Sequence, residues 1–134
     1  MENKIVLEEL KHVILKNENF DEIVEDELIP KYGWEIVEKA LFDILLDDAS
    51  SEKEYSAVAD IFWSAVLSKE KIDKEKTVGL LYYRLGDINA PYENNTIWSI
   101  SSELYHLDYT DSEFNPLKDK KILDELAEYD IYIK

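Results

Sequence analysis

The sequence predicts an all-helical fold, and three observations support that prediction. First, only three glycines and three prolines punctuate its 134 residues, whereas an all-β fold needs many more turns. Second, most apolar residues recur at intervals of three and four, the spacing of one helix face. Third, apolar residues make up 46% of the chain and aromatic residues 12%, which is enough to build a core, so these helices should fold rather than remain disordered. The length fits a single domain that spans residues 1–134.

The first two of about seven expected helices lie before Gly33. The first runs from about Glu2 to Lys16. Its apolar stripe consists of Val6, Leu10, Val13 and Ile14. The second begins after Asn19, a suitable N-cap that could form a capping box with Glu22. Pro30 and Gly33 are expected to interrupt the chain after it.

The next two helices are the most apolar. One is expected from about Tyr32 to Asp47. Its apolar face consists of Trp34, Val37, Leu41, Ile44 and Leu45. The other begins with Ser51, and Glu54 stands at the capping-box position. Apolar residues surround most of this helix up to Leu67, which predicts a central, buried helix.

Three further helices are expected in the second half of the chain. One starts near Asp73 and ends at Leu85, with Gly86 as its C-cap. Another spans about residues 96–107, and Pro116 is well placed to begin the last. The tail, residues 129–133, alternates between polar and apolar and could form a short strand or a frayed end.

A spacing of 21 residues links several apolar positions. The main row consists of Leu41, Phe62, Tyr83 and Leu104. One helix and its loop every 21 residues would give a helical hairpin about every 42, the size of a HEAT or armadillo repeat. This predicts antiparallel hairpins in a right-handed stack. The alternative is a closed helical bundle whose helices merely have similar lengths.

The charge of the chain excludes several classes of partner. With 31 acidic and 15 basic residues, the net charge is −16, which repels nucleic acid and anionic membranes. No apolar run is long enough for a signal peptide or a membrane span, so a cytoplasmic protein is expected. Because cysteine is absent, neither a disulfide framework nor a thiolate metal site is possible.

The sequence contains no convincing catalytic motif. Two Glu-x-x-His pairs, Glu9–His12 and Glu103–His106, have the spacing of di-metal ligands in helical bundles. On a helical wheel both pairs point away from the apolar stripe of their helix, so neither should form a metal site in the core. There is no nucleophile elbow and no glycine-rich phosphate loop. We therefore expect no enzyme, no cofactor and no bound metal.

The acidic residues are concentrated in two stretches without any basic residue. The first contains Glu18, Asp21, Glu22, Glu25, Asp26 and Glu27. The second, between Arg84 and Lys118, also holds several aromatic residues. Rings among carboxylates are typical of a surface that binds a basic protein. The sequence predicts a partner-binding surface formed by Asp87, Tyr92, Trp98, Glu103, Tyr105, Asp108, Tyr109, Asp111 and Glu113.

Two segments, WEIVEKALFDIL (34–45) and TIWSISSELYHL (96–107), resemble those of small, acidic, HEAT-like immunity proteins of bacterial polymorphic and contact-dependent toxin systems. The resemblance implies a protein that binds a cognate toxin, often a basic nuclease, and blocks its active site. A helical-repeat adaptor or regulatory subunit is the alternative, and a hydrolase or metal enzyme is the third hypothesis.

Overall fold

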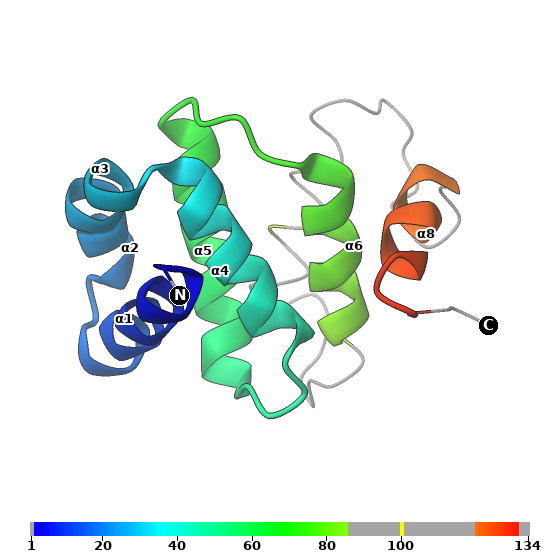
Figure 1. The fold of residues 1–134 in the computed structure, drawn as a ribbon, viewed down its shortest axis with the longest axis horizontal. Helices are drawn as coiled ribbons and strands as arrows, with labels where there is room; N and C mark the ends of the chain where they lie inside the picture. Colours follow the sequence, from blue (N-terminus) through cyan, green and yellow to red (C-terminus); the bar gives the residue numbers. More distant parts are fainter. Residues whose placement is uncertain (1, 86–99, 101–119, 132–134) are drawn as a thin grey trace. The chain divides into compact units, whose positions relative to one another are not determined.

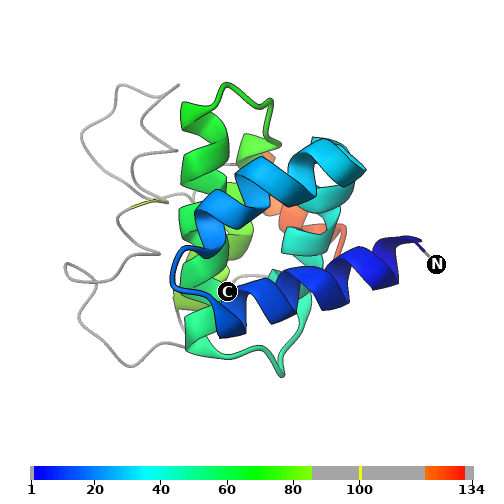
Figure 2. The ribbon, with the colours of Figure 1, turned by 90° about the vertical axis from the view of Figure 1, so that its left-hand side faces the viewer.

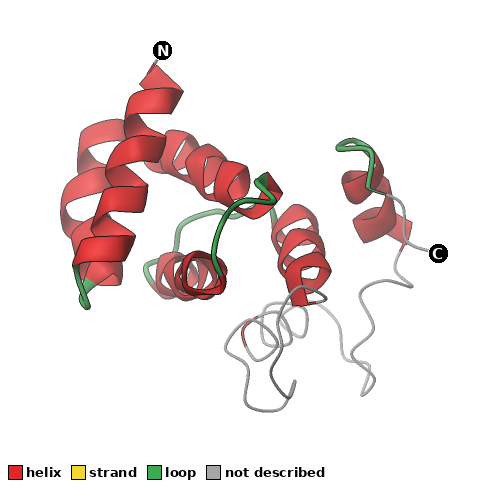
Figure 3. Ribbon diagram, turned by 90° about the horizontal axis from the view of Figure 1, so that it is seen from below, coloured by secondary structure: helices red, strands yellow, loops and turns green. Residues whose placement is uncertain are grey.

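The structure, a computed structural model, describes residues 2–85, 100 and 120–131. The chain divides into two compact units, Met1–Ile72 and Asp73–Lys134. Figure 3 shows that the described residues are helical apart from short connections, and no strand occurs among them. The predicted all-helical fold is confirmed for this part of the chain, while the single domain over residues 1–134 stays a prediction.

The first unit contains helices α1 (Glu2–Lys16), α4 (Trp34–Leu46) and α5 (Glu52–Leu67). Between α1 and α4, the chain forms a helical segment from Phe20 to Tyr32, which comprises α2 (Phe20–Ile23), a π-helical turn (Val24–Leu28) and α3 (Ile29–Tyr32). Helix α1 packs on α4, and the Phe20–Tyr32 segment packs on both α4 and α5. Figures 1 and 2 show α1 and this segment as one layer that lies across α4 and α5.

The core of the first unit follows the predicted apolar stripes. In α1 the four predicted residues, Val6, Leu10, Val13 and Ile14, are all buried. The largest fully buried side chain is Phe62 of α5. Its ring stacks on that of Phe42, with centroids 5.4 Å apart, and meets the edge of Trp34 at 5.8 Å. These three rings join α4 to α5, because Phe42 and Trp34 both belong to α4.

The Phe20–Tyr32 segment differs from its prediction at both ends. Asn19 makes no side-chain hydrogen bond to the helix, so the capping box with Glu22 was wrong. Pro30 does not interrupt the helix, which continues through it to Tyr32. The physical reason is a π-helical turn, Val24–Leu28, directly before the proline. In this turn the backbone hydrogen bonds depart from the regular α-helical pattern. The change occurs where the proline ring would otherwise clash with the preceding turn.

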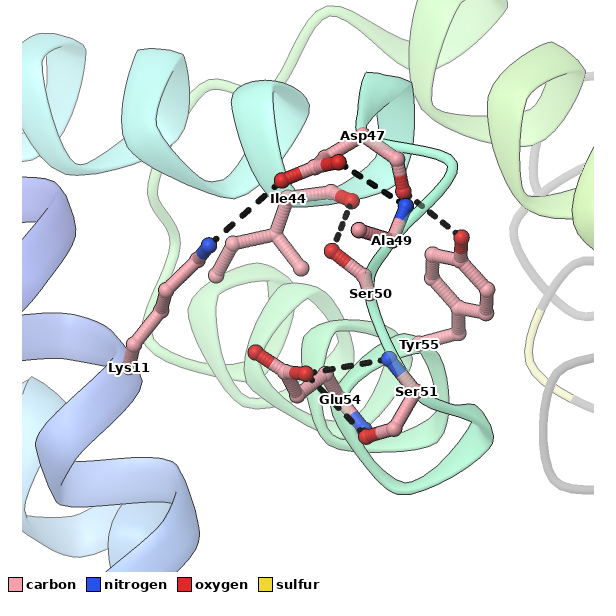
Figure 4. A network of polar contacts seen from close by, with 8 residues as sticks. All are labelled: Lys11, Ile44, Asp47, Ala49, Ser50, Ser51, Glu54 and Tyr55. Carbon is pink, nitrogen blue, oxygen red and sulfur yellow. Dashed lines mark hydrogen bonds and ion pairs between the residues drawn. The ribbon is translucent and has the colours of Figure 1, made fainter.

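The N-terminus of α5 has the predicted capping box. The Glu54 backbone N–H donates to Ser51 Oγ at 3.2 Å, and the Ser51 N–H donates to Glu54 Oε1 at 3.0 Å. Figure 4 shows both bonds closing the first turn. Two N–H groups that a helix start leaves without partners are thereby satisfied.

The loop between α4 and α5 is held by polar contacts to the ends of both helices. The Tyr55 hydroxyl donates to the backbone oxygen of Asp47 at 2.8 Å, and the Ser50 hydroxyl donates to that of Ile44 at 2.9 Å. The Ala49 N–H donates to Asp47 Oδ1 at 2.9 Å. Figure 4 shows that these bonds converge on the C-terminal end of α4, whose carbonyl groups need donor partners.

We predict that Ser51→Ala lowers the free energy of unfolding by about 1 kcal/mol, because an N–H of α5 loses its cap. Urea denaturation would measure the change. Ser56→Ala, in the interior of the same helix, is the matched control and should leave stability unchanged or slightly higher, since alanine is the better helix former. Equal stability of the two variants would contradict the capping role.

The second unit contains α6 (Lys74–Leu85) and α8 (Lys120–Ala127), which pack side by side (Figure 1). A Cβ atom added to Gly79 of α6 would lie 2.9 Å from Ile122 Cγ2 of α8, so glycine permits this close approach. Lys76 Nζ lies 3.8 Å from Asp73 Oδ2 and 3.9 Å from Glu125 Oε2. The pair with Glu125 joins α6 to α8, whereas the pair with Asp73 lies at the start of α6.

Predicted elements after Leu85 fall largely outside the described residues. Helix α6 begins one residue after the predicted Asp73 and ends at Leu85 as predicted, whereas Gly86 is not described. Of the helix expected at 96–107, only Ile100 is described, as helical and buried. For the tail, residues 129–133, a short strand or a frayed end was predicted; its described part contains no strand, and Tyr129 and Asp130 form a turn.

The 21-residue spacing marks core positions in the first unit. Leu41, Phe62, Val37 and Val58 are all fully buried. Tyr83 is only half-buried, and Leu104 lies outside the described residues. The spacing therefore identified equivalent inward positions of α4 and α5, while the HEAT-like stack and the total of seven helices stay predictions.

Candidate functional site

The nine residues predicted to bind a partner all lie outside the described residues. They are Asp87, Tyr92, Trp98, Glu103, Tyr105, Asp108, Tyr109, Asp111 and Glu113. That surface therefore stays a prediction. The other acidic stretch without a basic residue, Glu18–Glu27, is described throughout, and its surroundings can be examined.

This acidic stretch covers the start of the Phe20–Tyr32 segment. Most of its carboxylates are exposed, whereas Asp21 is half-buried. Glu25, in the π-helical turn, accepts hydrogen bonds from the hydroxyl groups of Ser64 and Ser68 in and after α5. The turn thus brings the Glu25 carboxylate into contact with α5, and these hydrogen bonds hold the acidic stretch against that helix. A widened turn of this kind is frequent at functional sites.

An open groove of about 430 Å³ lies where this stretch meets α5, and we call it the α2–α5 groove. Its lining combines carboxylates with apolar side chains: Glu18, Phe20, Asp21, Asp60, Trp63, Ser64 and Leu67. The α5 residues follow one another at three and four positions, so they share one helix face. Phe20 and Trp63 are half-buried, and Leu67 is 66% exposed.

A second hollow of about 340 Å³ continues the same surface toward the end of α1. It shares Glu18 and Phe20 with the α2–α5 groove and adds Leu15, which is 47% exposed, together with the polar residues Lys16, Asn17 and Lys53. Of the three large apolar side chains most exposed among the described residues, two therefore lie at these hollows. Apolar groups gathered in this way are typical of a protein-binding surface.

The two aspartates of the α2–α5 groove, Asp21 and Asp60, lie close enough to repel each other. The pKa of Asp60 is raised, mainly because partial burial removes water from its carboxylate and also because of the Asp21 charge. Within the part of the chain that the structure describes, Asp60 has neither an ion-pair nor a hydrogen-bond partner. Asp60 therefore brings to the groove a negative charge that no ion pair within this described part neutralises.

We predict that Asp60→Asn stabilises the protein at neutral pH, because the raised pKa means that folding disfavours the charged carboxylate. This penalty is absent below the unfolded-state pKa of about 3.9 and grows as pH rises to the folded-state pKa. For a half-exposed group the gain at neutral pH should be on the order of 0.5 kcal/mol. Thermal melts at about pH 7 and about pH 3 would measure it.

Asp26→Asn is the control for this experiment, since it removes the same charge from an exposed position in the same acidic stretch. Asp60→Asn should raise the melting temperature more than Asp26→Asn does at neutral pH, and the difference should vanish in acid. A difference of the same size at both pH values would argue against burial of the Asp60 charge.

The first Glu-x-x-His pair does not form a metal site in the core. His12 is exposed, as predicted, and Glu9 accepts a hydrogen bond from the Tyr32 hydroxyl and pairs with Lys31 at 3.8 Å. The Tyr32 hydroxyl and the Glu9 charge raise the pKa of Lys31. Among the described residues, no group of three or more potential ligands could hold a metal ion. The second pair, Glu103–His106, lies outside them.

Sequence reasoning missed the α5 side of the groove. Helix α5 was predicted to be buried around most of its circumference, and this was wrong for the face that carries Asp60, Trp63 and Leu67. The signal was present in Asp60 and Ser64, which are polar and one turn apart. They mark the stripe on which Trp63 reaches the surface rather than the core.

Further comparisons add no relative. Comparison of the chain with protein-family models, with curated proteins and with solved structures gave no match. No helix among the described residues combines the length and apolar content that a membrane crossing requires. A proposal about function therefore has to rest on the charge of the chain and on the geometry of the α2–α5 groove.

Proposed function

We propose that this chain is a non-catalytic protein that binds a basic protein partner through its acidic surface. In its specific form, the proposal is an immunity protein that neutralises a cognate bacterial toxin, such as a basic nuclease, by covering its active site. The observation that carries the proposal is the α2–α5 groove, which brings carboxylates from two elements together with exposed apolar side chains on a chain of net charge −16.

The two parts of the groove would contribute differently to binding. Aromatic rings that become fully buried often dominate the affinity of a protein interface, and burial of neighbouring apolar side chains adds to it. Carboxylates around them mainly accelerate association with a positively charged partner and exclude partners of the wrong charge. Trp63 and Leu67 fit the first role, and the Glu18–Glu27 stretch fits the second.

The same charge explains how binding could neutralise an enzyme. A nuclease needs basic groups at its active site because it holds phosphates. An acidic surface is complementary to such groups and would occupy the space that the nucleic acid needs. No catalytic residue of the immunity protein is required, which agrees with the lack of a recognisable catalytic motif in the sequence.

A binding experiment tests this proposal. The purified chain should be titrated by calorimetry with the product of the adjacent gene, because immunity genes lie next to toxin genes. We expect a 1:1 complex and loss of the toxin's activity at equal amounts of the two proteins. Raising the salt from about 0.05 to about 0.3 M should slow association much more than it changes dissociation.

The outcomes separate the parts of the proposal. Absence of binding at the lower salt concentration would reject this partner and with it the immunity function. Binding that leaves the partner's activity intact would support an adaptor or regulatory subunit instead. Binding with an association rate that does not respond to salt would reject electrostatic complementarity as its basis.

A further inference from the structure

We infer that the α2–α5 groove receives an amphipathic segment of the partner protein, with a lysine or arginine between Asp21 and Asp60 and an apolar side chain against Trp63 and Leu67. This inference rests on the proposed function, since it names what the binding surface recognises. It commits to one occupant, a basic protein segment.

The carboxylates favour an organic cation over a metal ion. Asp21 and Asp60 come from two different elements, α2 and α5, and both line the groove. Within the described residues they belong to no group of three potential ligands, whereas calcium and magnesium take six or more oxygen ligands. One ammonium or guanidinium group can instead be held by two carboxylates through charge-assisted hydrogen bonds.

Partial burial should make this pair of carboxylates bind a cation more strongly than the exposed acids of the chain do. An exposed ion pair contributes little because water screens it. Asp60 is half-buried and has lost part of its hydration already in the free protein. A cation that enters the groove therefore relieves repulsion between two carboxylates and meets a charge with less water to displace.

The apolar side chains explain why a segment rather than a free small cation would bind. Trp63 lies about one helix turn beyond Asp60, and Leu67 lies about two turns beyond it. An occupant must therefore place a charged group and an apolar group within roughly 10 Å of each other, which is a property of an amphipathic segment. The ring of Trp63 can also attract a neighbouring cation through its face.

Matched variants test the inference in the complex with the partner. Asp21→Asn combined with Asp60→Asn should weaken binding at least tenfold, mainly through faster dissociation. The control combines Asp26→Asn with Glu27→Gln, which removes the same charge from exposed positions outside the lining of the groove. It should change mainly the association rate, and the Kd by less than threefold. Equal losses in the two double variants would overturn the inference.

The apolar side of the groove has its own control. Trp63→Ala should also weaken binding at least tenfold without unfolding the protein, because the ring is half-exposed. Ile5→Ala removes an apolar side chain that is 59% exposed on α1 and does not line the groove, so it should bind normally. Normal binding by Trp63→Ala would overturn the inference.

A peptide probe tests the groove without the partner. The probe is an acetylated, amidated peptide of alternating leucine and arginine, and its control has glutamine in place of every arginine. The readout is the indole N–H signal of Trp63 in nuclear magnetic resonance spectra, which is assigned because it disappears in Trp63→Phe. The arginine peptide at up to millimolar concentration should shift this signal. The shift should be absent with the glutamine peptide and in the Asp21→Asn, Asp60→Asn variant.

The two proposals can fail separately in these experiments. If the adjacent gene product binds but the groove variants behave like their controls, the inference about the groove is wrong and the protein-binding function stands. If the arginine peptide shifts Trp63 but the gene product does not bind, the groove recognises basic segments and the toxin partner is wrong. No shift, or equal shifts with both peptides, would overturn the inference.

Discussion

Phe62→Ala is expected to lower the free energy of unfolding by about 3–5 kcal/mol, the largest effect of any change considered for this chain. Phe62 is fully buried in α5 and contacts the rings of Phe42 and Trp34 in α4. Its removal leaves a cavity between two helices and deletes both ring contacts. Urea denaturation followed by circular dichroism in the aromatic region would report the loss, because that signal depends on packed rings.

Phe62→Leu is the matched control for this prediction. Leucine keeps most of the apolar volume and loses only the ring contacts, so the cost should be clearly smaller, about 1 kcal/mol. A loss below about 1 kcal/mol for Phe62→Ala itself would mean that the α4–α5 contact does not carry the stability of the first unit.

Phe62 and Trp63 show how α5 serves both folding and recognition. These neighbours point to different sides of the helix, since Phe62 is fully buried and Trp63 lines the α2–α5 groove. Phe62→Ala should impair partner binding only as far as it unfolds the protein. Trp63→Ala should impair binding in a protein that remains folded, so the two variants distinguish a structural role from a binding role.

The sequence predicted those helices whose apolar pattern and caps agree. The stripes of α1 and α4 were identified correctly, because residues three and four apart must share a face. The capping box of Ser51 and Glu54 was also predicted, since it depends only on residues three apart. Such local rules succeed where the element needs nothing from the rest of the chain.

Pro30 shows where a local rule failed. A proline ring clashes with the preceding turn of a regular α-helix, so the sequence predicted an interruption. The π-helical turn at Val24–Leu28 changes the hydrogen-bond ladder before the proline, and the helix continues. The sequence contains no local signal for that turn. Its Glu25 accepts hydrogen bonds from Ser64 in α5 and Ser68 directly after α5, which lie 39 and 43 positions further along the chain.

The complete groove was not found from the sequence for a related reason. Its two aspartates, Asp21 and Asp60, are far apart in the chain and meet only because α2 packs on α5. The search for acids near rings in one stretch of sequence selected residues 87–113 instead. The high apolar content of α5 concealed Trp63 among the residues expected to be buried.

Gly33→Ala is expected to lower the free energy of unfolding by about 2–3 kcal/mol, the second large effect. Gly33 joins the Phe20–Tyr32 segment to α4 with φ +89° and ψ 149°, a conformation that essentially only glycine adopts. Its N–H donates to the Ile29 oxygen at 2.8 Å, and its own oxygen accepts the first hydrogen bond of α4 from Val37. The junction is thus fixed on both sides and cannot relax to suit a side chain.

Two further variants identify backbone strain as the cause. No atom lies within 4 Å of a Cβ added at Gly33, so no neighbouring substitution should rescue Gly33→Ala. At Gly79, by contrast, the added atom meets Ile122, so Gly79→Ala should cost less stability in an Ile122→Ala background than in the unchanged protein. Gly33→Asn should be as unstable as Gly33→Ala, because asparagine tolerates the left-handed helical region but not an extended ψ at positive φ.

The conformation of Gly33 should also affect the α2–α5 groove. This residue joins the Phe20–Tyr32 segment to α4 and so sets the angle between them. If strain at the junction shifts that segment, Asp21 moves relative to Asp60. Gly33→Ala should therefore weaken binding of the arginine peptide even under conditions where the variant is fully folded, and the Trp63 indole signal would report it. A variant with normal stability and normal peptide binding would contradict the role assigned to Gly33.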